Sequence, residues 1–350
     1  MVRLLKLLLT YQFKSSQPRQ KTSGFTLIEL LVGLALAFLV IIPLLGFMIN
    51  IMDADRKEQA KASSEQDLQA ALSYMARDLE QSVYIYDQDG IAAVRGSLPQ
   101  ETDKGVELEP VLVFWKRQFL PNSLPIRGAT NCTNPKECDD SYVYSLVAYF
   151  TEKDPAASCA KKENWSCTTQ IRRFQIKDGV PRNTIDWWQP PDDGFQPFTK
   201  VSLKAGVAGN SSLEKKMNSW VKDAKPYKQQ PEVLIDYIDQ SIAADNKIPY
   251  AACPADVELD DSGKPILNDK GATIPVWTQV PAPANTKTYS FYACTSASRT
   301  SAQVFLRGNA LARIRPKTTP PKYVESLSAY FPKASIQVQG RGLFNNNQNK

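Results

Sequence analysis

The sequence predicts an α+β protein in which a long N-terminal helix packs on an antiparallel β-sheet head with loop insertions. Three observations support this fold class. An uncharged apolar run covers residues 30–49, and residues 53–82 continue it without Gly or Pro in a composition of strong helix formers. The remainder alternates apolar and polar residues with period two between turn-forming segments, as strands do.

The N-terminal run is long enough to cross a membrane. About 20 residues at a rise of ~1.5 Å span ~30 Å, the thickness of a bilayer core. The preceding leader, residues 1–24, carries five cations and no acid. Basic flanks stay on the cytoplasmic side, so we expect a membrane helix over 25–52 with all later residues outside. Glu29 lies just inside this span, and a carboxylate there costs ~2.5–3.5 kcal/mol, which makes it a candidate functional residue.

The helix is expected to continue beyond the membrane. Leu68, Leu72, Met75 and Leu79 form one apolar stripe at helical spacing, and Val83 extends it. Residues 53–86 are therefore interpreted as an amphipathic continuation that ends at about Val83.

Pro43 lies inside the apolar half of this helix. Proline removes one backbone hydrogen bond, which predicts a kink or loosened turn near Leu39–Pro43. A membrane proline that the helix tolerates without function is the equal alternative.

The stretch from Gly24 to Glu29 reads Gly-Phe-Thr-Leu-Ile-Glu and follows a basic leader. It resembles the processing and assembly signature of type IV pilins and of the pseudopilins of type II secretion. The resemblance implies cleavage between Gly24 and Phe25 by a prepilin peptidase, followed by N-methylation of Phe25. It also implies that Glu29 pairs with the N-terminal amine of a neighbouring subunit. The alternative is an ordinary single-pass anchor with an acid at its interface.

This resemblance also implies partners and a location. The partners would be prepilin peptidase, the membrane, and other pilins or pseudopilins that contact the N-terminal helix. The chain would cross the inner (plasma) membrane once, with a periplasmic head that reaches the pilus or cell surface after assembly.

A second resemblance begins at the end of the helix. Arg77-Asp78-Leu79 followed by a Tyr-rich strand is similar to J-type pseudopilins and larger minor pilins. With its length and cysteine-rich head, the chain most resembles the C-type pseudopilins of hormogonium polysaccharide secretion. This implies a pilus-like machine for gliding motility and polysaccharide export, with polysaccharide as a further partner. A J-type subunit of type II protein secretion is the alternative. Arg77 and Asp78 themselves are expected only to cap and solvate the helix end.

Composition argues against several function classes. The chain has no histidine, which removes Ser-His-Asp and Cys-His catalysis and every His-based metal site. No nucleophile motif or Gly-rich phosphate loop is present, so we expect neither an enzyme nor a cofactor. The net charge of +6 falls to +1 when the five leader cations are subtracted (6 − 5). Such near-neutrality gives no reason to expect a nucleic-acid partner.

Six cysteines lie on the side that we expect to be exported. An even number in an oxidising compartment predicts disulfides, although many pairings are possible. Pairing of sequence neighbours is favoured. This gives the bonds Cys132–Cys138, Cys159–Cys167 and Cys253–Cys294.

The head is expected to occupy residues 87–343, followed by a disordered polar tail at 344–350. Residues 87–90 have the composition of a turn, residues 178–232 are expected to be mostly irregular, and 213–221 are a candidate short helix. The expected strands are 106–115, broken at Pro110, then 142–150, 168–177, 233–238, 287–295, 303–311 and 327–338.

Two segments are candidate binding sites. Trp187 and Trp188 would suit contact with a partner or a glycan, as in an adhesin head on a pilin stem, or they fill space under a long loop. The second segment offers oxygen ligands for calcium at Asp256, Glu258, Asp260, Asp261 and Asp269. Their spacing does not match an EF-hand, and two turns joining short strands explain the segment equally well, so no metal site is predicted.

Overall fold

The computed structural model describes residues 24–126, 131–132, 134–162, 164–183, 186–197, 212–242, 248–268, 271–283, 288–314 and 319–341. The chain divides into two compact units, one ending at Asp55 and the other beginning at Arg56. The expected leader, apart from Gly24, and the expected tail at 344–350 lie outside the described residues.

One helix, α2 (Leu27–Glu80), contains 54 residues and extends from the first unit into the second. It continues through Pro43, so the proline does not interrupt the helix. The helix ends at Glu80 instead of near Val83, and the expected continuation to residue 86 is wrong at its end. The reason is that strand β1 (Ser82–Ile85) leaves the helix axis and pairs with strand β2 (Leu108–Pro125).

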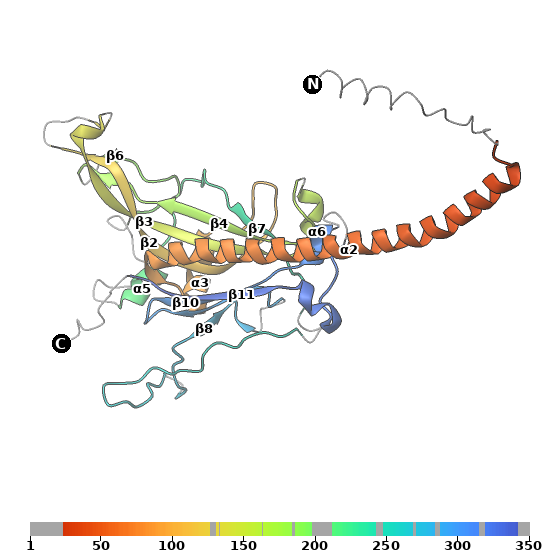
Figure 1. Cartoon of the computed structure of the whole chain (residues 1–350). Coiled ribbons are helices and arrows are strands. Elements are labelled where there is room, and N and C mark those ends of the chain that lie inside the picture. Colours follow the sequence, from red (N-terminus) through yellow and green to blue (C-terminus); the bar gives the residue numbers. More distant parts are fainter. Residues whose placement is uncertain are drawn as a thin grey trace, which may run out of the picture. The chain divides into compact units, whose positions relative to one another are not determined.

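Five antiparallel strands form the larger sheet of the second unit, which confirms the α+β class (Figure 1). Their order is β1, β2, β3 (Cys138–Glu152), β4 (Thr169–Lys177) and β7 (Glu232–Ile238). Pro110 was expected to divide a strand pair, but β2 continues through it. The register between β2 and β3 shifts between Pro110 and Leu112, and such an irregularity is how a strand accommodates proline.

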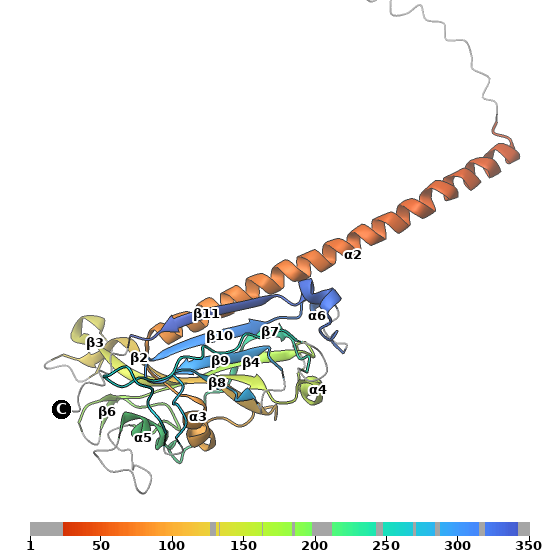
Figure 2. The ribbon, with the colours of Figure 1, turned by 90° about the horizontal axis from the view of Figure 1, so that it is seen from below.

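A second antiparallel sheet has the order β11, β10, β9 and β8, where the sequence predicted only one sheet. These strands are β8 (Thr278–Val280), β9 (Phe291–Ser296), β10 (Ser301–Arg307) and β11 (Lys333–Gln339). Figure 2 shows them side by side, with β11 next to the C-terminal half of α2. A further pair, β5 (Val180–Pro181) and β6 (Trp187–Gln189), lies within the segment expected to be irregular.

The main core joins α2 to both sheets. Met75 and Leu79 of the helix share it with Phe114 of β2 and Val304 of β10, and all four are almost completely buried. A second core covers the opposite face of the five-stranded sheet, around Trp115. Neighbouring residues of β2 and β3 therefore alternate between two buried faces, which explains why these strands are apolar on both sides.

Short helices replace several expected turns and strand ends. Residues 87–90 open helix α3 (Gln88–Val94) because the Asp87 side chain accepts a hydrogen bond from the Gly90 amide and so caps the helix. The strand expected to reach 311 ends at Arg307. The strand expected from 327 begins at Lys333. Further helical segments among the described residues are α4 (Pro155–Ser158), α5 (Leu213–Asn218), α6 (Ala310–Ile314) and the 3₁₀ turns Arg95–Ser97, Pro135–Glu137, Cys159–Lys161 and Glu325–Tyr330.

Three disulfides join the cysteines in the favoured pairs: Cys132–Cys138, Cys159–Cys167 and Cys253–Cys294. The first two close loops with sequence separations of 6 and 8. The third has a separation of 41 and ties residue 253 to strand β9.

Candidate functional site

The predicted assembly residue, Glu29, lies in the first turn of α2. Thr26 precedes the helix, and its side-chain oxygen accepts a hydrogen bond of 3.3 Å from the Glu29 amide. Thr26-x-x-Glu29 is thus a capping-box pattern, and an acid in the first turn also suits the helix dipole. The local chemistry of a helix start accounts for an acid at this position even before any partner subunit is considered.

The predicted cleavage point is open. Phe25 is 81% exposed, and no atom would lie within 4 Å of a side chain at Gly24. The Glu29 carboxylate is exposed as well, and it forms no ion pair with the described residues. The residues of the signature therefore stand free of the rest of the described chain.

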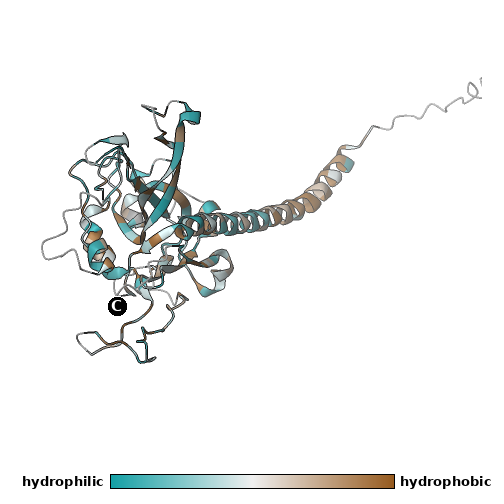
Figure 3. Cartoon of the chain, turned by 90° about the vertical axis from the view of Figure 1, so that its left-hand side faces the viewer, coloured by the Kyte–Doolittle hydropathy of each residue, from teal (hydrophilic) through white to brown (hydrophobic). Residues whose placement is uncertain are grey.

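The apolar half of α2 has no apolar environment within the described part of the chain. Every large apolar residue from Leu27 to Met52 is at least 45% exposed. Figure 3 shows this half of the helix as predominantly hydrophobic. In the described part of the chain, α2 is the one helix whose length and composition allow it to cross a membrane. A surface of this size needs lipid or the apolar helices of other subunits around it.

The other half of α2 is built into the head. Burial begins at Ala60 and continues through Ser64, Leu68 and Met75, which lie on one side of the helix. Gly308, next to β10, lies close to Leu68, where an added Cβ would be 3.4 Å from a Leu68 methyl carbon. The second half of the helix is therefore a packed element of the head.

Asp78 is the electrostatic centre of this junction. One carboxylate oxygen lies 2.7 Å from the Lys116 ammonium, and the other lies 2.7 Å from both the Arg173 guanidinium and the Tyr149 hydroxyl. Burial would raise the pKa of Asp78, but the hydrogen bonds and charges of Arg173 and Lys116 outweigh burial and lower it. The same contacts raise the pKa of Arg173 against the opposing effect of its burial.

The expectation that Asp78 caps and solvates the helix end is therefore wrong. Its neighbour Arg77 is exposed, whereas Asp78 is 7% exposed and connects the helix to β2, β3 and β4. A signal for this was present in the sequence. Asp78 follows Met75 by three residues and so lies on the buried side of the apolar stripe.

The tryptophans of β6 are only partly exposed. Trp188 packs against Leu120, Val143 and Val180, and the Arg182 guanidinium lies 4.7 Å from its ring centre. One ring face is thereby engaged within the chain. For Trp188, this packing favours the alternative in which the side chain fills space within the chain.

The acidic segment after residue 255 forms two tight turns. Isolated bridges join Leu259 to Pro265 and Leu267 to Thr273, and Gly263 has a φ of +77°, which favours glycine. Asp260 accepts backbone hydrogen bonds within its own turn. Asp269 lies outside the described residues, and the described acids include no group of three arranged to hold a metal ion.

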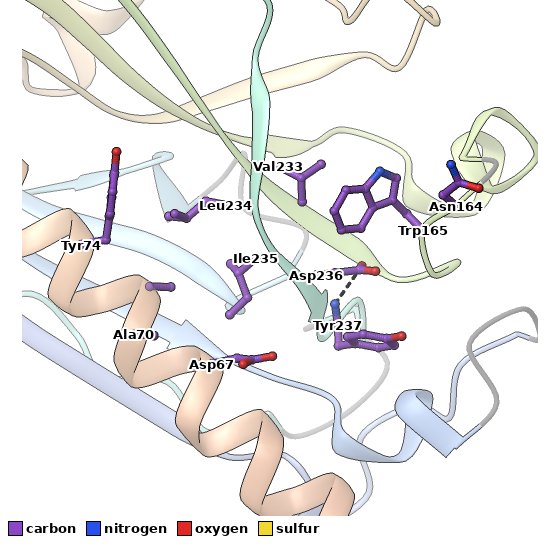
Figure 4. A pocket seen from close by; sticks show the side chains of 11 residues that line it. Asp67, Ala70, Tyr74, Asn164, Trp165, Val233, Leu234, Ile235, Asp236 and Tyr237 are labelled. Carbon is purple, nitrogen blue, oxygen red and sulfur yellow. Dashed lines mark hydrogen bonds between the residues drawn. The ribbon is translucent and has the colours of Figure 1, made fainter.

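A cavity of about 540 Å³ lies between α2 and β7, with Tyr74, Trp165 and Tyr237 in its lining (Figure 4). Its two carboxylates already have partners. Asp67 pairs with Arg313, and Asp236 accepts hydrogen bonds from the amide and hydroxyl of Ser166. This arrangement provides a polar and aromatic groove without an unpaired acid.

The comparisons with known proteins agree with the start of the chain. Residues 19–45 match the family described as the prokaryotic N-terminal methylation motif. Neither a curated protein nor a solved structure shows significant similarity to the chain. The match contains Gly24, Phe25 and Glu29 together with the first part of the exposed apolar helix. It supports a type IV pilin-like protein that prepilin peptidase processes and that carries its own, unmatched head.

Proposed function

We propose that the chain is a minor pilin or pseudopilin of a type IV pilus-like machine. Prepilin peptidase cleaves it between Gly24 and Phe25, methylates Phe25, and thereby releases it for assembly into a filament. The main support for this proposal comes from helix α2. Its first half exposes apolar side chains on all sides after a methylation motif, and its second half is packed in the core of a head.

The proposed topology follows from the same helix. The leader 1–24 stays cytoplasmic, 25–52 crosses the inner membrane, and the disulfide-containing head is exported. Positive charge in the leader and cysteine pairing in the head both support this orientation.

A minor role fits the size of the head better than a major one. The second unit begins at Arg56 and contains two main sheets with long connecting segments. A main pilin must stack very many identical heads, and such insertions make dense stacking harder. Because Glu29 is retained, we place the subunit below another one whose N-terminal amine can approach this carboxylate.

The choice of machine rests on the resemblance of the helix end and the head to pseudopilins of hormogonium polysaccharide secretion and to J-type pseudopilins. Polysaccharide export with gliding motility is the first choice, and type II protein secretion is the second. A strain that lacks the chain should lose surface polysaccharide and gliding while its secreted proteins remain. Loss of secreted proteins with normal polysaccharide would contradict this choice.

Filament assembly is tested with Glu29→Gln, which removes the charge and nearly preserves the shape. The matched control is Glu58→Gln, an exposed acid farther along the same helix. Sheared filaments should contain the control variant at the wild-type level and the Glu29 variant at a small fraction of it, with both variants cleaved. Equal incorporation of the two variants would remove the role assigned to Glu29.

Gly24→Ala separates processing from assembly. It should leave the chain in the membrane fraction with its leader attached, since the peptidase would no longer cleave before Phe25. Normal cleavage of this variant would contradict the assigned processing site.

A further inference from the structure

A cleft of about 390 Å³ opens on the four-stranded sheet, and no motif in the sequence pointed to it. Strands β9, β10 and β11 contribute to it together with residues 249–251 and 289. We call it the cationic–aromatic cleft, and its defining residues are Tyr250, Tyr289, Tyr292, Phe305, Arg307 and Lys333. Its volume lies in the range of ~300–1,000 Å³ that is usual for small-molecule sites.

Four aromatic rings line the cleft in a continuous series. Tyr250 stacks on Tyr289 with ring centres 4.3 Å apart, and Tyr289 meets Tyr292 edge to face at 5.9 Å. Tyr292 stacks in turn on Phe305 at 4.6 Å.

One of these rings is fixed and another is open to solvent. The Tyr292 hydroxyl donates to the Ala251 carbonyl and accepts from the Ala251 amide, which holds the Tyr250 segment in place. Tyr250 is 49% exposed, so the series ends in an aromatic surface that solvent reaches.

Two cations face each other at the same cleft. Arg307 of β10 and Lys333 of β11 are direct cross-strand partners, and like charges in this position destabilise a sheet. Lys333 is an exposed residue, and the partial desolvation of its ammonium group, followed by the charge of Arg307, lowers its pKa. The fold therefore retains an unfavourable charge pair at the rim of an aromatic cleft.

Only one acid compensates these cations among the described residues. Asp239 binds the Arg307 Nε at 2.8 Å, while the buried Nη2 of Arg307 has no hydrogen-bond partner in the described part of the chain. None of the described residues lining the cleft is Asp or Glu. The cleft thus has an excess of positive charge next to an exposed ring, which is complementary to an anion with an apolar face.

We propose that the cationic–aromatic cleft binds an acidic saccharide unit, whose carboxylate approaches Lys333 and whose ring packs on Tyr250. A carboxylate forms charge-assisted hydrogen bonds with an ammonium group. The apolar C–H face of a sugar ring suits an aromatic surface, whereas a simple anion would leave that surface unused. This inference rests on the proposed exported head and adds a ligand class to it.

Binding is measured by calorimetry on the full-length chain in detergent micelles, so the result does not depend on filament assembly. The probes are trigalacturonate, the neutral sugar maltotriose, inorganic phosphate and a short polyglutamate peptide. Trigalacturonate should bind at least tenfold more tightly than each of the others. If phosphate bound as tightly as trigalacturonate, the proposal that the cleft recognises a sugar ring would be wrong. If polyglutamate bound more tightly than trigalacturonate, the ligand would be an acidic peptide and the saccharide proposal would be wrong.

Two exposed positions test the geometry without disturbing the buried Arg307. Lys333→Gln should weaken trigalacturonate binding at least tenfold, and Tyr250→Ala should weaken it by a similar factor. Lys264→Gln makes the same charge change in an exposed turn outside the cleft and should bind as the wild type does. Unchanged affinity in both cleft variants, or an equal loss in the Lys264 control, would overturn the proposal.

Discussion

Replacing Asp78 by Asn tests how the helix is held in the head. The substitution preserves the shape of the side chain but removes the charge that faces Lys116 and Arg173, each 2.7 Å away. Both cations are largely buried, with side-chain exposures of 9% and 17%, so water cannot replace the lost carboxylate fully. Removing one partner of a buried ion pair costs about 3–5 kcal/mol.

The expected loss is large enough to measure by thermal unfolding of the full-length chain in detergent. Intrinsic tryptophan fluorescence reports on the head, because all six tryptophans lie in the unit that begins at Arg56, among them the completely buried Trp115 of β2. For the unit from Arg56 to Lys350, a loss of about 3 kcal/mol corresponds to a fall in Tm of about 5 °C. The exposed neighbour Arg77 provides the control, because Arg77→Gln should change stability by less than about 0.5 kcal/mol. A Tm for Asp78→Asn within about 2 °C of that of the wild type would refute the reasoning.

Two further predictions concern acid and the disulfides. The folded-state pKa of Asp78 is lowered, so its stabilisation is present above its unfolded pKa of about 3.9 and is lost as pH falls through the folded value. Urea midpoints measured from neutral to strongly acidic pH should therefore fall less steeply at low pH in Asp78→Asn than in wild type; parallel curves would contradict the assignment. In the chain-entropy relation, loops with separations of 41 and 6 are worth about 4 and about 2 kcal/mol. Replacing Cys253 and Cys294 by Ser should accordingly lower the urea midpoint more than replacing Cys132 and Cys138, and the reverse order would argue against the entropic account.

Local chemistry in the sequence was enough to predict the start of the chain and its long helix. The helical conformation around Glu29 and along the uncharged run after it requires no contact with a distant residue. The predicted end of the helix was wrong because strand β1 begins at Ser82, directly after the helix. The disulfide pairing could also be predicted from the sequence, because each cysteine pairs with the next cysteine along the chain.

The features that the sequence did not reveal depend on long-range contacts. The second sheet requires β10 and β11 to find their register across a long connection between Arg307 and Lys333. The cationic–aromatic cleft likewise unites Tyr250 with residues from three later strands. The burial of Asp78 could be predicted from its position on the helix. Its pairing with Arg173 could not, because Arg173 lies on a strand far along the chain.

The most direct test of the central claim is the mass of the mature N-terminal peptide. The full chain is expressed with a prepilin peptidase, purified from membranes, and digested for mass spectrometry. We expect a peptide that begins at Phe25 and carries one N-methyl group, because residues 19–45 match the methylation motif and the Gly24–Phe25 bond is open. A chain that begins at Met1, or at an unmodified residue after Phe25, would contradict the assignment to the pilin-like class.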